Sequence, residues 1–99
     1  MKKMISWVMY DIQSNKARTK VAKYCKQAGL HRVQYSVFLG TLNKNQKDNL
    51  ELLTAELINP DIDKVYIFQM SRQELKQTVL LGQAFDKKII TNQVKALFF

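Results

Sequence analysis

Asp11 is the residue of this chain whose type and position best fit chemistry on phosphate groups. It is the only carboxylate in the first 47 residues, which also hold ten of the sixteen lysines and arginines. It directly follows the apolar run Met4–Tyr10, and burying an unpaired carboxylate merely for packing is costly. An isolated acid at a strand end, facing basic residues, is therefore a candidate metal ligand for phosphate chemistry.

The expected metal is Mg²⁺ or Mn²⁺, which prefers oxygen ligands and is often bound by one or two carboxylates. One Asp11 is a poor site, but a twofold dimer could bring two copies together, with water and phosphate completing the shell. We expect Asp11 to be the catalytic residue and the metal ligand, one from each protomer. The same position also allows a simpler interpretation, a loop acid paired with Arg18.

The charge of the chain is concentrated in its first half. Residues 1–47 carry a net charge of +9 and residues 48–99 a net charge of −1, within a total of +8. A basic half of this kind attracts a polyanion, nucleic acid before a membrane. The expected contacts are residues that neutralise phosphates or stack on bases: Tyr10, Lys16, Arg18, Lys20, Lys23, Arg32 and Phe38. Plain solvation competes for the basic residues, and a place in the core competes for the two aromatic ones.

Several function classes are excluded by missing patterns. The chain has no phosphate-binding P-loop, no GxGxxG, no zinc-type cysteine and histidine spacing and no RNA-recognition octamer. The single cysteine, Cys25, allows no intrachain disulfide, which favours a reducing cytoplasm. No apolar run approaches the roughly 18 residues of a membrane span, so we expect a cytoplasmic protein without membrane contact.

The pattern of the chain predicts alternating strands and helices in one domain, residues 1–99. The first expected elements are a strand over 4–12, a helix over about 16–28 closed by Gly29, a strand over 31–39 and a bend or hairpin at Gly40 into a short strand near 41–42. They are followed by a helix over about 43–58 ended by Pro60, a strand over 64–70 and a short β segment over 78–81. This order is βαββαβ with an extra C-terminal strand, an α+β, ferredoxin-like plan.

Such a plan has an antiparallel sheet with both helices on one face. The other face would hold aromatic residues that are too apolar to leave in water: Trp7, Phe38, Tyr66, Phe68 and the Phe98-Phe99 tail. We therefore expect a homodimer packed through the sheet faces, with residues 83–99 as a C-terminal segment that contributes to the dimer.

Several segments together resemble the Cas2 family of CRISPR-associated proteins: Tyr10-Asp11-Ile12, Arg18 and Lys20, Gly29, residues 32–38 (RVQYSVF), 65–68 (VYIF) and 79–82 (VLLG). The resemblance covers nearly the whole chain. It implies a small homodimer that works with the Cas1 integrase in spacer acquisition. Asp11 matches the acid of the first strand that is assigned to the metal. Lys20 stands where an arginine is common, and it offers a point charge in place of a bidentate fork.

The resemblance also implies roles for further residues and leaves three functions open. Tyr10, Arg18, Arg32 and Phe38 match family positions tied to activity or substrate contact. The first function is a CRISPR adaptation protein with metal-dependent endonuclease activity on single-stranded RNA or duplex DNA. The second is a non-catalytic DNA-binding scaffold that bridges integrase subunits. The third is a toxin-like ribonuclease of similar fold.

Overall fold

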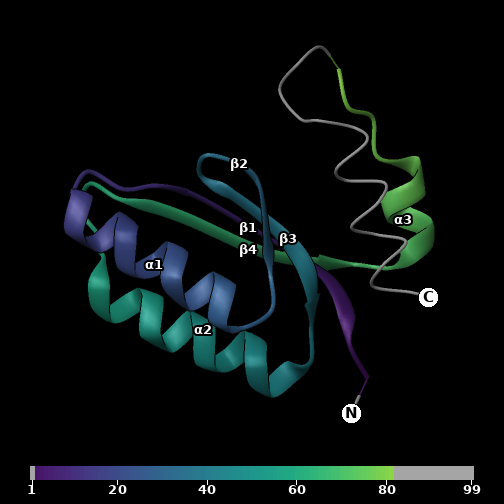
Figure 1. Ribbon diagram of the computed structural model, residues 1–99, viewed down its shortest axis with the longest axis horizontal. Helices are drawn as coiled ribbons and strands as arrows, with labels where there is room; N and C mark the ends of the chain where they lie inside the picture. The colour runs from purple at the N-terminus through teal and green to yellow at the C-terminus, as the bar shows by residue number, and fades with distance from the viewer. Residues whose placement is uncertain (1, 82–99) are drawn as a thin grey trace.

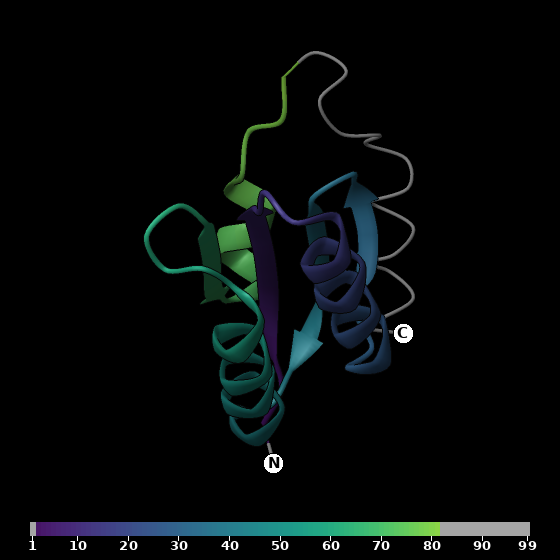
Figure 2. The same cartoon turned by 90° about the vertical axis from the view of Figure 1, so that its left-hand side faces the viewer.

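The computed structural model describes residues 2–81. Its elements are β1 (Met4–Asp11), α1 (Asn15–Gln27), β2 (His31–Gln34), β3 (Val37–Leu42), α2 (Lys44–Leu57), β4 (Lys64–Met70) and α3 (Arg72–Gln77). The strands form one antiparallel sheet in the order β2-β3-β1-β4. Helices α1 and α2 pack on one face of this sheet (Figures 1 and 2). This confirms the α+β, ferredoxin-like plan.

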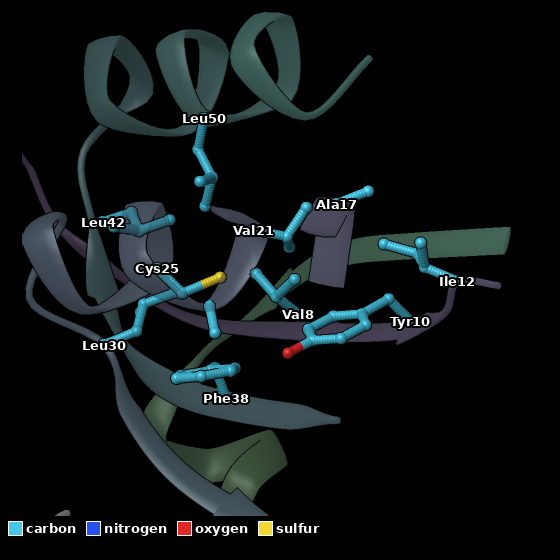
Figure 3. Packing of buried hydrophobic residues seen from close by; sticks show 11 residues of the cluster. Val8, Tyr10, Ile12, Ala17, Val21, Cys25, Leu30, Phe38, Leu42 and Leu50 are labelled. Atoms are coloured by element: carbon cyan, nitrogen blue, oxygen red, sulfur yellow. The ribbon is translucent and has the colours of Figure 1, made fainter. Parts of the chain in front are cut away.

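The main core lies between the two long helices and the sheet. Helix α1 begins after Ser14, whose hydroxyl accepts a hydrogen bond from the backbone N–H of Ala17 at 3.2 Å. Figure 3 shows Leu50 entering the cluster from α2 and Phe38 entering it from β3, on the opposite side. Burial in this cluster raises the pKa of the Cys25 thiol to about 12, so Cys25 stays protonated and packs as a small apolar residue.

The expected single strand over residues 31–39 is wrong. The chain turns at Tyr35-Ser36, so that β2 and β3 form a hairpin, and Gly40 lies inside β3. The alternation of apolar and polar residues runs through a two-residue turn without a break, so the sequence pattern did not reveal the turn. Gly40 is needed for a different reason: an added Cβ would lie 2.8 Å from Leu30 Cδ2 and 3.1 Å from Leu30 Cα.

We expect Gly40→Ala to lower the free energy of unfolding by about 1–3 kcal/mol, because β3 and the backbone of Leu30 must then move apart. Urea denaturation followed by circular dichroism measures the loss. Thr41→Ala, one residue along the same strand, is the control and should cost less. Equal urea midpoints for Gly40→Ala and the unchanged protein would show that the close approach of Gly40 to Leu30 does not affect stability.

The second face of the sheet is partly covered by the chain itself. Trp7 is only 2% exposed: it forms a buried cluster with Ile5 and Leu39, against which Leu75 of α3 and Leu80 pack. Phe38 was expected on this face, but it is completely buried on the helix side. Neither residue therefore needs a partner subunit to cover it. Tyr66, at 58% exposed, and Phe68, at 37%, remain open to solvent on this face.

The end of the described chain also differs from expectation. Residues 78–81 form no strand, because no strand of the described residues pairs with them. Helix α3 was not foreseen; Ser71 and Glu74 start it with a reciprocal capping box. The expected dimer segment 83–99, with the Phe98-Phe99 tail, lies outside the described residues. Within residues 2–81, no helix has the length and apolar character of a membrane span.

Candidate nucleic-acid interface

Asp11 is the exposed last residue of β1, and it projects from the face of the sheet that α1 and α2 leave open. Side chains alternate along a strand: Tyr10 points into the helix-side core, whereas Met9 packs on the other side with Trp7. Asp11 thus shares a face with Met9. In the sheet it lies opposite Lys64 of β4.

A shallow depression of about 400 Å³ surrounds Asp11. Its lining residues are Met9, Tyr10, Asp11, Gln34, Tyr35, Ser36, Val37 and Tyr66. The backbone that follows Asp11 is fixed by Asp63, whose carboxylate accepts hydrogen bonds from the N–H of Gln13 at 2.9 Å and of Asn59 at 2.8 Å. Asp63 has a structural role, and Asp11 is the acid that remains available at this strand end.

A second hollow, the basic groove, lies between α1 and β2 and has a volume of about 520 Å³. Its lining residues are Tyr10, Asn15, Arg18, Thr19, Ala22, Lys23, Lys26, Gln27, Arg32 and Tyr35. Four of them are cationic and none is a carboxylate. A groove that gathers positive charge in this way attracts a polyanion. Tyr10 and Tyr35 line both the groove and the depression at Asp11, so the two hollows meet at this end of the sheet.

Arg18 does not pair with Asp11. Its Nη1 donates a hydrogen bond to the backbone carbonyl of Ile12 at 3.0 Å, which ties the first turn of α1 to the end of β1. Among residues 2–81, the ion pair observed joins Lys44 and Asp48. The interpretation of Asp11 as a loop acid neutralised by Arg18 is therefore wrong, and Asp11 keeps its charge available for a ligand.

Arg32 is held over aromatic rings. Its Cζ lies 5.1 Å from the ring centroid of Phe38 and 5.7 Å from that of Tyr35, distances that give a cation–π attraction. Burial raises the pKa of Tyr10, and the neighbouring Arg32 guanidinium acts in the opposite direction, so Tyr10 stays neutral. These contacts orient a guanidinium whose own side chain remains exposed.

The structure brings together some of the residues expected to contact nucleic acid. Arg18, Lys23, Arg32 and Tyr10 meet in the basic groove. Lys16 and Lys20 are exposed on α1 but lie outside the lining of the groove.

The expectation that Phe38 stacks on a base is wrong, because Phe38 is 0% exposed. Phe38 supports Arg32 and packs near Tyr10, with ring centroids 6.3 Å apart.

Two further residues of the groove, Lys26 and Tyr35, were not predicted from the sequence as contacts for nucleic acid. Lys26 follows Lys23 by three positions, a spacing that puts both on one side of a helix, so the pattern already contained it. Tyr35 carried no such signal, because its position depends on the turn between β2 and β3.

A single chain does not supply a complete metal site. Within residues 2–81, no group of three or more histidine, cysteine, aspartate or glutamate side chains gathers at one place. Asp11 alone offers one carboxylate, whereas Mg²⁺ is commonly bound by one or two carboxylates with water and phosphate oxygens. The residues present fit a metal ion only if a second copy of Asp11, from another chain, completes the site.

Comparison with known proteins shows the family to which the chain belongs. The family model described as CRISPR associated protein Cas2 matches residues 4–78, which run from the start of β1 to just beyond α3. The chain belongs to the Cas2 family. The resemblance found in the sequence is thereby confirmed.

Individual relatives support the assignment. The chain is 34% identical over 70 residues to a CRISPR-associated endoribonuclease Cas2 of Archaeoglobus fulgidus, covering 71% of this chain and 74% of that protein. It is 36% identical over 73 residues to another from Desulforudis audaxviator, covering 74% and 69%. The crystal structure of a hypothetical protein from Thermus thermophilus superposes with a TM-score of 0.69 at 30% identity, covering 82% and 93%.

Proposed function

We propose that this Cas2-family chain is a metal-dependent endonuclease of CRISPR adaptation, which acts with the Cas1 integrase in spacer acquisition on single-stranded RNA or duplex DNA. The observation that carries the proposal is the adjacency of the exposed Asp11 and the basic groove, through Tyr10 and Tyr35. A strand bound by its phosphates in the groove lies next to a free carboxylate. The names of the relatives, which describe endoribonucleases, support phosphodiester cleavage.

Each of these residues has a role that follows from its side-chain chemistry. Arg32, whose planar fork is already oriented, binds phosphate oxygens with two parallel hydrogen bonds. Lys23 and Lys26 attract the backbone as point charges. Asp11 from each of two chains would hold Mg²⁺ or Mn²⁺. When bound, such an ion lowers the pKa of a water molecule and stabilises the charge that develops on the phosphate.

The proposed partner for Asp11 is a second copy of the chain, packed face to face. Asp11 lies on the same open face of the sheet as Tyr66 and Phe68, which are 58% and 37% exposed. Burying these side chains against a second chain removes apolar surface from water and brings two copies of this face together. The homodimer therefore supplies both the missing cover and the second carboxylate.

Removal of the metal tests the proposal directly. We expect cleavage of a single-stranded RNA or a duplex DNA in Mg²⁺ and none in EDTA, because a lone Asp11 cannot activate water without the ion. Gel analysis of end-labelled substrates measures the products, and readdition of Mg²⁺ should restore cleavage. Equal cleavage in EDTA would contradict a metal-dependent mechanism.

A non-catalytic scaffold is the second candidate, favoured by the four cations of the basic groove, which bind phosphates without help from Asp11. Duplex DNA held in this way would bridge integrase subunits. The family match favours either CRISPR role over a toxin-like ribonuclease of similar fold.

For duplex binding, the double variant Lys23→Gln/Lys26→Gln should reduce the slope of log affinity against log salt by about 2, since each phosphate contact contributes about 0.9. The control removes two lysines elsewhere, Lys47→Gln/Lys76→Gln, which have the same effect on net charge. Fluorescence anisotropy at several salt concentrations gives both slopes. If the two double variants change the slope equally, net charge and not the groove determines binding.

A further inference from the structure

Tyr35 is an exposed aromatic residue in an unusual place. It lies in the two-residue turn between β2 and β3, and 72% of its surface is open to solvent. Tyr35 lines both the basic groove and the depression at Asp11. Its ring thus lies where the phosphate-binding surface meets the candidate acid.

The contact with Arg32 fixes Tyr35 relative to the phosphate-binding groups. The guanidinium carbon is 5.7 Å from the Tyr35 ring centroid and 5.1 Å from that of the buried Phe38. Phe38 is packed in the core, so it supports Arg32, and Arg32 in turn orients the Tyr35 ring. An arginine can keep its plane against a ring while its N–H groups bind a phosphate.

We propose that Tyr35 is a base-stacking residue that positions one unpaired nucleotide of the substrate beside Asp11. The inference rests on the proposed function and extends it to the state of the nucleic acid. The phosphate of that nucleotide binds Arg32 and the lysines of the groove, while its base lies on the open part of the Tyr35 ring. Aromatic side chains stack on any base, because every base has a π-face.

The base must be unpaired for a geometric reason. In a duplex, both faces of every internal base are occupied by its neighbours, so a protein ring can stack only on an end or on a base that leaves the helix. A single strand exposes its bases and lets them stack on aromatic side chains. The structure therefore assigns Tyr35 to single-stranded stretches of RNA or DNA.

A double-mutant cycle between the protein and the nucleic acid tests this role. Binding is measured in EDTA, so that cleavage does not interfere, with short fluorescent RNA and DNA strands that are intact or carry one abasic nucleotide at each position in turn. The proteins are wild type, Tyr35→Ala, Tyr35→Phe and, as a control, Leu52→Ala, which truncates an exposed apolar residue of α2 outside both hollows. We expect Tyr35→Ala to weaken binding of intact strands between about 5-fold and 100-fold. Tyr35→Phe should bind as wild type does.

The cycle separates stacking from a general loss of affinity. For one abasic position, wild type should lose as much affinity as Tyr35→Ala loses on the intact strand, and Tyr35→Ala should lose nothing further. Additive losses at every position, or an equal loss for duplex and single strands, would overturn the stacking role. If wild type binds neither single strands nor a duplex, the proposed function fails; if wild type binds single strands and Tyr35→Ala binds them equally well, only the role of Tyr35 fails. RNA and DNA strands compared in the same assay show which sugar is preferred.

Discussion

Asp11→Asn should reduce metal-dependent cleavage at least about 100-fold while leaving the fold unchanged. Altering merely a hydrogen-bond partner of a metal ligand costs about 10–100-fold in metal affinity or activity, and loss of a ligand's charge costs more. The substitution preserves shape, and Asp11 is exposed at the end of β1, so stability has little reason to fall. Cleavage rates in Mg²⁺ and thermal unfolding, measured on the same preparations, check both parts.

The matched control is Asp61→Asn, the same chemical change at an exposed residue before β4. It should cleave at the wild-type rate. Mixed dimers test whether each metal site takes Asp11 from two chains. If it does, wild type refolded with excess Asp11→Asn should lose more activity than dilution alone explains. Full cleavage by Asp11→Asn would contradict the catalytic assignment of Asp11, whereas spacer acquisition that persists in a variant unable to cleave would favour the scaffold.

Phe38→Ala should lower the free energy of unfolding by about 3–5 kcal/mol, as expected when a fully buried phenylalanine is truncated. Phe38 is 0% exposed and contacts the helix-side core, including Tyr10. A domain of this size has a total stability of only about 5–15 kcal/mol, so the loss removes a large share. Urea denaturation followed by tryptophan fluorescence gives the value.

Two further variants separate the core role of Phe38 from a surface role. Phe38→Leu keeps most of the buried volume and should cost clearly less than Phe38→Ala. Its binding to single strands should weaken less than that of Tyr35→Ala, because it loses the ring beneath Arg32 but keeps the ring proposed to stack on the base. A stable Phe38→Leu variant that binds no better than Tyr35→Ala would mean that support of Arg32, and not stacking on Tyr35, determines binding.

Much of the fold was predictable because hydrophobic periodicity and capping residues mark most elements. The strand over 64–70 was predicted with the observed bounds, and both long helices were predicted to within about one residue at each end. The hairpin was not, since the alternation of residues 31–39 runs across its turn without a break. Gly40 looked like a bend, but its real cause, the approach of Leu30, is a tertiary contact that no local pattern contains.

The candidate site was predictable where it depends on charge and less so where it depends on burial. Asp11 stood out because it is isolated among basic residues, and the structure leaves it exposed and unpaired within the described chain. Phe38 was misplaced because an alternating strand has two possible inner faces, and the sequence alone did not show which one the helices cover. Tyr35 was not predicted because the position of a turn residue depends on how the two strands that it joins pack.

The two halves of the candidate site lie on opposite sides of the sheet, and this limits the shape of what can reach both. Asp11 projects from the open face, whereas Arg32 lies beside Phe38 on the helix side. A polymer that touches both must curve round the rim of the sheet at Tyr10 and Tyr35. Duplex DNA resists such a bend, with a persistence length of about 150 bp, but a single strand does not. A flexible strand would therefore reach the carboxylate more readily than a stiff duplex, which must bend or open at this rim.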